Sequence, residues 1–199
     1  MDQRQALRHL KRDKTLSQII VKYNVPPILP SANLFSDLLE SIVGQQLSIK
    51  AANTIYKRFL ALFPGEELPE PADILKLEDE VLRACGLSRQ KASYLKSLST
   101  EIISGNVDLD CLNDLSDEAV ISSLTRVKGI GRWTAEMFLI FTLGRPDVFS
   151  PGDLGLCTAV SRLYGVKRGD LSAITQISSA WAPHRSLASR ILWKSLENV

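Results

Sequence analysis

The 199-residue sequence has few cysteines, and they lie far apart. Cys85, Cys111 and Cys157 form no CxxC pair and no set of four ligands, so the usual patterns of a structural zinc site or an iron–sulfur cluster are absent. An odd, scattered set of cysteines is typical of reduced thiols in an intracellular protein. We therefore expect an intracellular protein, cytoplasmic in a bacterium or nuclear in a eukaryote.

The sequence also lacks a long hydrophobic run and a strong charge of one sign. Its start, "MDQRQALRHLKRDK", is charged throughout, so neither a signal peptide nor a membrane span is predicted. Lys and Arg total 24 against 22 Asp and Glu. No membrane association is expected, and a nucleic-acid surface would have to be local because no cationic tail exists.

No alternating strand pattern and no low-complexity segment is found, whereas helical periodicity dominates. One segment places four apolar residues on one helical face behind Asn33, a suitable N-cap; these are Leu38, Leu39, Ile42 and Val43. Other segments begin at a capping residue or proline, and several end at glycine. The pattern predicts an all-α protein with about nine or ten helices. The proline-rich "NVPPILPSAN" would separate an N-terminal helix, which could pack with the C-terminal helices, from a central helical block.

The segment "VKGIG" (127–131) predicts a very short turn between two helices. Glycines allow positive φ and close backbone approach, and the amides that open the next helix carry partial positive charge suited to a phosphate. Lys128 and Arg132 add charge beside them. A bare GxG, however, is most often an ordinary turn between helices.

The surrounding residues make the pattern specific. "LTRVKGIGRWTAEMFLIFTLGRPDVFSPGDLGL" (124–156) resembles the helix-hairpin-helix motif and Gly/Pro-Asp loop of the HhH-GPD DNA glycosylase superfamily, and is most similar to its 3-methyladenine DNA glycosylase II (AlkA-type) branch. Three further segments match this branch in the same order: "SIVGQQLSIKAA" (41–52), "CGLSRQKASYLKSL" (85–98) and "WAPHRSLASRILW" (181–193).

The resemblance implies an all-α HhH-GPD fold with two helical lobes flanking an active-site cleft. Residues 34–145 would form a central lobe that includes the helix-hairpin-helix at about 118–144. Residues 1–33 and 146–199 would form the second lobe. The chain would be a short form without the N-terminal β-rich domain of some bacterial members, and a monomer.

The resemblance also implies the contacts with double-stranded DNA. The hairpin residues Lys128, Gly129, Gly131 and Arg132 would bind the backbone, and the carbonyls of Thr125, Val127 and Ile130 would hold a structural Na⁺ or K⁺. Gln46 aligns with the side chain that fills the gap left by a flipped base, with Gln45 and Leu47 beside it. Ser88 and Lys91, at another helix start, would touch phosphates, although such charge clusters are usually solvated faces. No other cofactor and no iron–sulfur cluster is implied.

Asp153 is the candidate catalytic residue. Because it follows Pro151 and Gly152 and opens a helix, its spacing alone indicates an N-cap. Helix N-terminal amides also favour an ionised carboxylate, which stabilises the oxocarbenium-like sugar formed as a base departs. The resemblance places Asp153 at the family's catalytic aspartate, with a second role in orienting the attacking water.

The nucleophilic lysine of bifunctional relatives corresponds to Trp133, which cannot form a Schiff base. The resemblance therefore implies a monofunctional enzyme without AP lyase activity. Trp133 and Trp193 match two aromatic positions of the base pocket, although both could be core residues. Met137 and Lys194 stand where the best-known bacterial member has tyrosines. This difference puts the substrate range of the present protein in question.

Together these features predict a DNA glycosylase that flips alkylated purines out of the duplex and hydrolyses their N-glycosidic bond, which initiates base-excision repair. Its substrates would be 3-methyladenine and, by extension, 7-methylguanine. Two alternatives stay open. One is a non-catalytic helix-hairpin-helix DNA-binding module, and the other is the same fold acting on 1-methyladenine, hypoxanthine or uracil.

Overall fold

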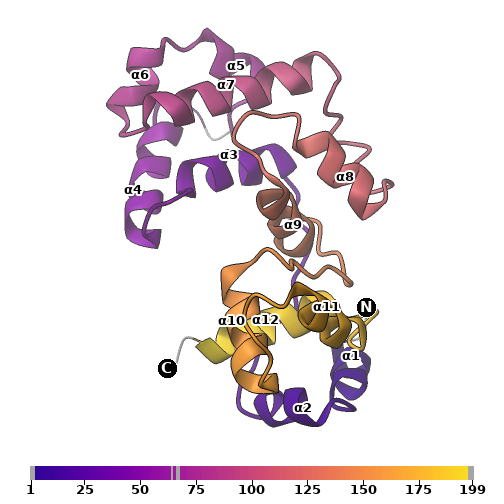
Figure 1. Ribbon diagram of the computed structural model, residues 1–199. Helices are drawn as coiled ribbons and strands as arrows, with labels where there is room; N and C mark the ends of the chain where they lie inside the picture. Colours follow the sequence, from indigo (N-terminus) through magenta and orange to yellow (C-terminus); the bar gives the residue numbers. More distant parts are fainter. Residues whose placement is uncertain (1–2, 64, 66–67, 197–199) are drawn as a thin grey trace. The chain divides into compact units, whose positions relative to one another are not determined.

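The computed structural model describes residues 3–63, 65 and 68–196. Over these residues the chain forms twelve α-helices and no strand (Figure 1), which confirms the all-α prediction. The helices are α1 (Gln3–Leu10), α2 (Lys14–Ile20), α3 (Leu34–Gly44), α4 (Ile49–Leu60), α5 (Pro71–Lys76), α6 (Asp79–Ala84), α7 (Arg89–Ile103), α8 (Asp117–Leu124), α9 (Arg132–Phe141), α10 (Leu154–Tyr164), α11 (Leu171–Ser179) and α12 (Arg185–Leu196).

Helical periodicity predicts one helix over residues 71–86 and one N-terminal helix. The structure divides each of them in two, so the count exceeds the predicted nine or ten. The segment 71–86 forms α5 and α6, since Leu77 and Glu78 have extended ψ values of 136° and 149°. The N-terminal segment forms α1 and α2, because Asp13 takes an extended conformation and caps α2. At Asp13 a polar N-cap interrupts the helical pattern that the apolar spacing alone would continue, whereas Glu78, which precedes α6, makes no side-chain capping bond.

The chain divides into two compact units. The discontinuous unit comprises residues 1–30 and 139–199, and the continuous unit comprises residues 31–138. The sequence places these divisions at 34 and 145 instead. The second difference arises because α9 is one unbroken helix that passes the division between Phe138 and Leu139.

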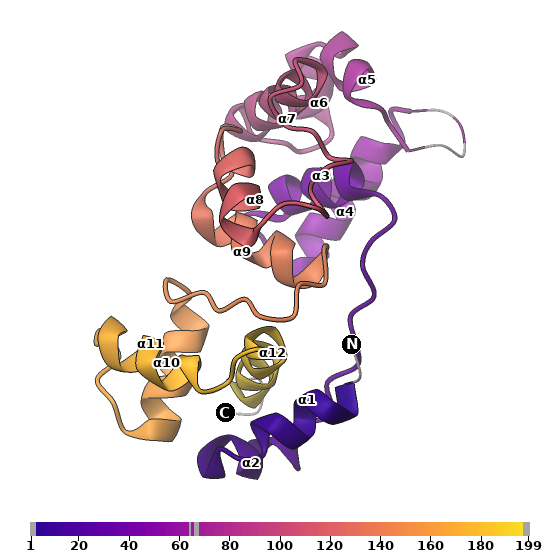
Figure 2. The ribbon, with the colours of Figure 1, turned by 90° about the vertical axis from the view of Figure 1, so that its right-hand side faces the viewer.

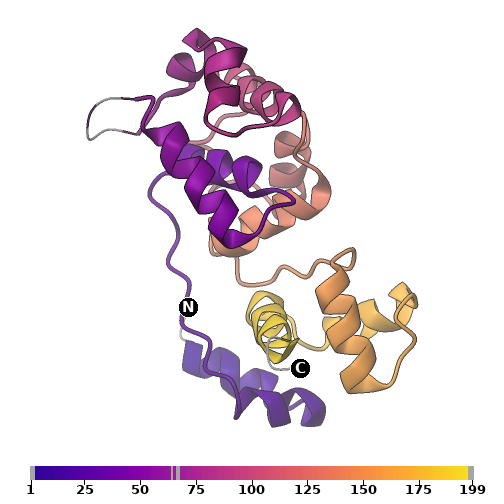
Figure 3. The same ribbon diagram turned by 90° about the vertical axis from the view of Figure 1, so that its left-hand side faces the viewer.

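The discontinuous unit joins the two ends of the chain. Its N-terminal helices lie beside the C-terminal helix α12 (Figures 2 and 3). Its core contains Leu16 of α2, Leu156 and Val160 of α10 and Leu192 of α12, all with no exposed surface. The predicted packing of the N-terminal helix with the C-terminal helices is therefore confirmed within this unit.

A partly buried polar contact joins the start of α2 to Tyr164 of α10 and to Trp181. Asp13 Oδ1 accepts hydrogen bonds from the Thr15 and Leu16 amides, both 2.9 Å long, and its Oδ2 accepts from Tyr164 Oη at 2.6 Å and Trp181 Nε1 at 2.9 Å. Burial acts to raise the pKa of Asp13, but these four hydrogen bonds outweigh it and lower that pKa below its ordinary value. Burial and the bond to Asp13 raise the pKa of Tyr164.

The continuous unit is built around α3 and α7. The four apolar residues predicted to share one face of α3 are fully buried, and Asn33 caps this helix by accepting from the Ser36 amide at 2.8 Å. Helix α7 runs alongside α5 and α6 (Figure 1) and also packs on α3. Both predictions for α3 are thus confirmed, and α7 reaches several segments of this unit.

The described part of the chain contains neither a candidate membrane-spanning helix nor a candidate metal-ligand cluster. None of its helices combines the length and hydropathy needed to cross a membrane. No group of three or more His, Cys, Asp or Glu side chains in it is placed to hold a metal ion.

Candidate active site and DNA-contact loops

Asp153 caps α10 and is buried in the discontinuous unit, with 8% of its surface exposed. Its Oδ1 accepts a 2.7 Å hydrogen bond from the Leu156 amide, as the N-cap prediction requires. The same oxygen accepts a 2.9 Å bond from Trp193 Nε1, on a helix 40 residues further along the chain. The Cys157 thiol donates to the Pro151 carbonyl at 3.1 Å and holds the preceding turn against α10. Backbone and indole donors therefore fix the carboxylate in one orientation.

An aromatic neighbour supports the Trp193 indole, and a glycine leaves room for it. Phe141, at the end of α9, stacks on the indole with 5.6 Å between ring centroids and 30° between planes. A Cβ at Gly155 would lie 3.1 Å from Asp153 Oδ1 and 3.1 Å from Trp193 Cδ1, closer than ordinary contact. Glycine at position 155 thus lets the carboxylate and the indole meet.

A hollow of about 280 Å³ lies beside Trp193. Trp193, Phe141, Arg190 and Lys194 line it together with residues 24–26. The Arg190 guanidinium donates to the Pro26 carbonyl at 2.6 Å, and burial lowers its pKa. Two of the four predicted base-binding residues, Trp193 and Lys194, therefore border one hollow. Two cationic side chains, Arg190 and Lys194, line this hollow.

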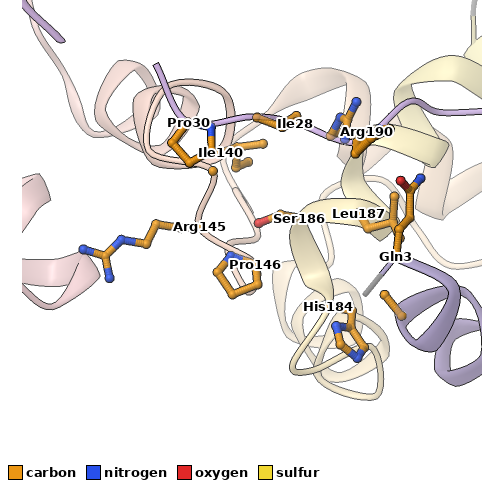
Figure 4. A pocket seen from close by; sticks show the side chains of 13 residues that line it. Gln3, Ile28, Pro30, Ile140, Arg145, Pro146, His184, Ser186, Leu187 and Arg190 are labelled. Carbon is orange, nitrogen blue, oxygen red and sulfur yellow. The ribbon is translucent and has the colours of Figure 1, made fainter. Parts of the chain in front are cut away.

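A second cavity of the discontinuous unit, of about 210 Å³, contains none of the predicted site residues. Ile140, Pro30 and Leu187 give it an apolar lining, and the Arg145 side chain extends away from the other labelled residues (Figure 4). His184 lines it too, and burial together with the neighbouring His9 lowers the pKa of His184. Asp153 does not line this cavity, which shares Arg190 with the hollow beside Trp193.

Charge is divided unequally between the two units. The discontinuous unit has 13 Lys and Arg against 6 Asp and Glu, a net charge of +7, whereas the continuous unit has 11 against 16, a net charge of −5. The whole-chain value of +2 conceals this difference, because the cationic unit is assembled from both ends of the sequence. The unit that contains Asp153 therefore has a net positive electrostatic potential, which attracts polyanions.

The predicted glycine hairpin is present between α8 and α9. Gly129 has φ of +88°, and a Cβ there would lie only 2.1 Å from the Tyr94 ring, so both the backbone and the packing require glycine. The Tyr94 hydroxyl accepts from the Gln90 side chain, and Ser97 Oγ accepts from the Lys128 amide at 3.1 Å. Helix α7 thus supports the hairpin through Tyr94 and Ser97. The Lys128 side chain is exposed.

Several polar groups of the hairpin have no partner among the described residues. The amides of Gly129 and Gly131 donate no hydrogen bond within that part of the chain. The Val127 carbonyl accepts from the Ile130 amide at 3.1 Å, but no described donor bonds to the carbonyls of Thr125 and Ile130. Such amides and carbonyls are suited to a phosphate and to a monovalent cation, respectively.

The residues that open α9 differ in their surroundings. Arg132 pairs with Glu118, with a separation of 2.5 Å, and with the buried Glu136 at 3.0 Å, so its charge is already balanced by protein groups. Trp133 is half exposed, unlike a core tryptophan, and Met137 is half-buried one turn further on. The structure therefore leaves the Trp133 indole accessible and ties Arg132 to its neighbours.

The loop of Gln45, Gln46 and Leu47, predicted to fill the gap left by a flipped base and called the wedge loop below, is a tight turn after α3. The Leu47 amide donates to the Gly44 carbonyl at 3.2 Å, Gln45 has φ −51° and ψ 131°, and Gln46 has φ +57°. These angles resemble a type II turn, which favours glycine or asparagine at its third position. Gln46 is the only non-glycine residue with positive φ in the described part of the chain, and this costs about 1–2 kcal/mol. Backbone strain of this kind is common at functional positions.

Lys91 and Ser88 act within the protein. The Lys91 ammonium donates to the carbonyls of Val43 and Gln45 at 2.7 and 2.6 Å, and burial lowers its pKa. Ser88 caps α7 by accepting from the Lys91 amide at 3.1 Å. Their contact with phosphate, inferred from sequence, stays a prediction, and the structure gives each a local structural role.

Sequence reasoning overlooked four residues around these sites: Phe141, Gly155, Tyr94 and Ser97. Each acts through a partner at least 31 residues distant, except for Gly155, whose nearest neighbours include Asp153. Only the short spacing between Asp153 and Gly155 could have been noticed in the sequence. The other contacts depend on how the helices pack.

The HhH-GPD superfamily of base excision DNA repair proteins matches residues 39–184, which include the wedge loop, the hairpin and Asp153. The chain belongs to this superfamily. The structure agrees with this match, because a glycine hairpin joins α8 to α9 and an aspartate caps α10.

Individual HhH-GPD relatives are similar over nearly the whole chain. A DNA-3-methyladenine glycosylase of Schizosaccharomyces pombe is 34% identical over 92% of this chain and 81% of its own length. A crystal structure of a DNA-3-methyladenine glycosidase from Bacillus halodurans has 40% identity and a TM-score of 0.83, covering 94% of this chain and 86% of that chain. The S. pombe 3-methyladenine DNA glycosylase in complex with abasic DNA has 34% identity and a TM-score of 0.82, covering 97% of both chains.

Proposed function

We propose that this protein is a monofunctional DNA glycosylase that hydrolyses the N-glycosidic bond of alkylated purines in double-stranded DNA. Its substrates are 3-methyladenine and 7-methylguanine, each extruded from the helix before cleavage. The observation that carries the proposal is the buried carboxylate of Asp153, held by the Leu156 amide and the Trp193 indole in a chain whose relatives are named 3-methyladenine glycosylases.

Asp153 stabilises the reaction electrostatically. As the C1′–N bond breaks, the bonding electrons leave with the base and the sugar becomes oxocarbenium-like. An ionised carboxylate beside the sugar lowers the energy of that cation. Asp153 orients a water molecule, which bonds to C1′ and releases its proton to the solvent. An alkylated, cationic purine is a good leaving group, so the reaction requires neither a strong general acid nor an organic cofactor.

The chemistry ends at the abasic site. Trp133 occupies the place of the lyase lysine, and an indole cannot form the Schiff base that strand cleavage needs. Lys128 lies within the hairpin, and its backbone amide is tied to Ser97. We therefore propose base release without a strand break.

Four side chains are proposed to contact the extruded base: Trp133, Trp193, Met137 and Lys194. The exposed indole of Trp133 and the Phe141-supported indole of Trp193 can stack on a purine, and their faces attract a cation by about 0.5–2 kcal/mol. Lys194 and Arg190 near Trp193 oppose a cationic base. This balance favours a narrow substrate range.

The hairpin and the wedge loop are proposed to hold the DNA. The amides of Gly129 and Gly131 bind a phosphate with support from Lys128 and Arg132, and the carbonyls of Thr125, Val127 and Ile130 bind Na⁺ or K⁺ beside it. Gln46 and Leu47 enter the minor groove, while Gln45, Ser88 and Lys91 lie behind the groups that touch DNA and hold protein backbone groups in place. The protein is proposed to act as an intracellular monomer.

Release of free base from methylated duplex DNA tests the proposal directly. The wild-type protein should liberate 3-methyladenine, and the products should show strand breaks only after alkali treatment. Nicking before alkali would contradict the monofunctional assignment. Tight binding of abasic DNA without release of any methylated base would instead indicate a non-catalytic DNA-binding module.

A further inference from the structure

Helix α7 contacts both predicted DNA-binding loops of the continuous unit through one face. Lys91, Tyr94 and Ser97 are spaced by three residues, which places them along the same side of the helix. Lys91 bonds to the end of α3, Tyr94 packs against Gly129, and Ser97 accepts from the Lys128 amide. One rigid element therefore touches the wedge loop and the hairpin together.

The two loops are also joined directly. The side-chain amide of Gln45 donates to the Gly129 carbonyl at 2.9 Å, between residues 84 positions apart. The backbone carbonyl of the same Gln45 accepts from the Lys91 ammonium at 2.6 Å. The contacts form a closed circuit that runs from α7 to Gln45, from Gln45 to the hairpin, and from the hairpin back to Tyr94 of α7.

This circuit surrounds the strained residue of the wedge loop. Gln46 directly follows Gln45 and has the unfavourable φ of +57°. A non-glycine residue keeps such a conformation only when its surroundings hold it there. The Lys91 ammonium holds the backbone on one side of Gln46, and the Gln45 side chain anchors that backbone to the hairpin.

We propose that Lys91 and Gln45 are positioning residues that hold the wedge loop against the phosphate-binding hairpin. Gln46 then enters the duplex at a fixed position relative to the DNA backbone that the hairpin binds. This inference rests on the proposed function of these loops. Lys91 acts on the protein backbone and makes no phosphate contact. Gln45 acts through the Gly129 carbonyl rather than through a base.

The test compares Lys91→Met, Gln45→Leu and the double variant with Lys96→Met as the control. Lys96 lies on the same helix, but its ammonium pairs with Asp79 and not with a loop carbonyl. Thermal unfolding first establishes that each variant folds. Wedge insertion is then followed by 2-aminopurine fluorescence in a duplex that carries this base opposite a tetrahydrofuran abasic site. Affinity for undamaged duplex is measured over a range of salt concentrations.

Each single variant should lower the fluorescence change on binding, through a loss of about tenfold in the inserted population, because Gln46 can then relax. The double variant should lose little more than the worse single variant, since both residues act in one circuit. Affinity for undamaged DNA and its salt slope should match the wild type and Lys96→Met.

Two results would overturn the inference. A salt slope reduced by about one for Lys91→Met would identify Lys91 as a phosphate contact. Full wedge insertion by both folded single variants would show that the circuit does not position Gln46. Neither readout requires base release, so failure of the wild type to excise 3-methyladenine would count against the proposed function alone.

Discussion

Replacing Gly155 by alanine adds one methyl group between the carboxylate of Asp153 and the indole of Trp193. The new Cβ would lie 3.1 Å from Asp153 Oδ1 and from Trp193 Cδ1, whereas ordinary contact begins at 3.4 Å. Both groups must move by a few tenths of an ångström. The 2.9 Å bond from Trp193 Nε1 to Asp153 then lengthens towards the limit of a useful hydrogen bond.

The loss of that bond sets the size of the effect. A hydrogen bond to a charged acceptor contributes about 1.5–3 kcal/mol, so we expect the rate of base release to fall by about 10- to 100-fold. Alanine is favoured over glycine by about 1 kcal/mol within a helix, and Gly155 is the second residue of α10, so this gain offsets part of the lost bond. We expect the free energy of unfolding to fall by no more than about 2 kcal/mol. The substitution therefore separates activity from folding.

The assay is the single-turnover rate of 3-methyladenine release, measured beside thermal unfolding. Gly169→Ala is the matched control, because a Cβ at position 169 meets no atom within 4 Å. The control should retain the wild-type rate. A Gly155→Ala protein with an unchanged rate would refute the view that the indole must hold the carboxylate in place.

Two further predictions concern stability. Gln46→Gly should raise the melting temperature by about 1–4 °C, because glycine relieves the positive-φ cost, while wedge insertion falls in the 2-aminopurine assay; a lower melting temperature would contradict the strain at this position. Asp13→Asn should cost about 2–3 kcal/mol in urea unfolding at pH 7, because the amide nitrogen cannot accept a hydrogen bond from Tyr164 or Trp181. The folded-state pKa of Asp13 is lowered, so its stabilisation is complete above the unfolded-state pKa and is lost as pH falls through the folded-state pKa. The difference between wild type and Asp13→Asn should narrow below about pH 4, and a constant difference would exclude this linkage.

Local chemistry made part of the fold predictable. Asn33 caps α3 as expected, because an N-cap depends on a side chain and an amide three residues later. The apolar face of α3 followed from helical periodicity. Asp153 also caps its helix as its spacing indicated.

Contacts between distant segments could not be read from the sequence. The Trp193–Asp153 bond spans 40 residues, and the Asp13–Trp181 bond spans 168. The bonds of Lys91 to the end of α3 could not be predicted either, because they depend on how α7 packs and not on the position of the lysine at a helix start. The charge difference between the units was hidden because one unit is discontinuous in sequence.

The central claim is that the Asp153 carboxylate promotes cleavage of the N-glycosidic bond. Single-turnover release of 3-methyladenine by Asp153→Asn, at enzyme concentrations that saturate the DNA, tests it most directly. We expect a rate at least about 100-fold below wild type, with affinity for abasic DNA within a few-fold of it, since the amide keeps the shape but not the charge. Release by the folded Asp153→Asn protein at the wild-type rate would contradict the claim.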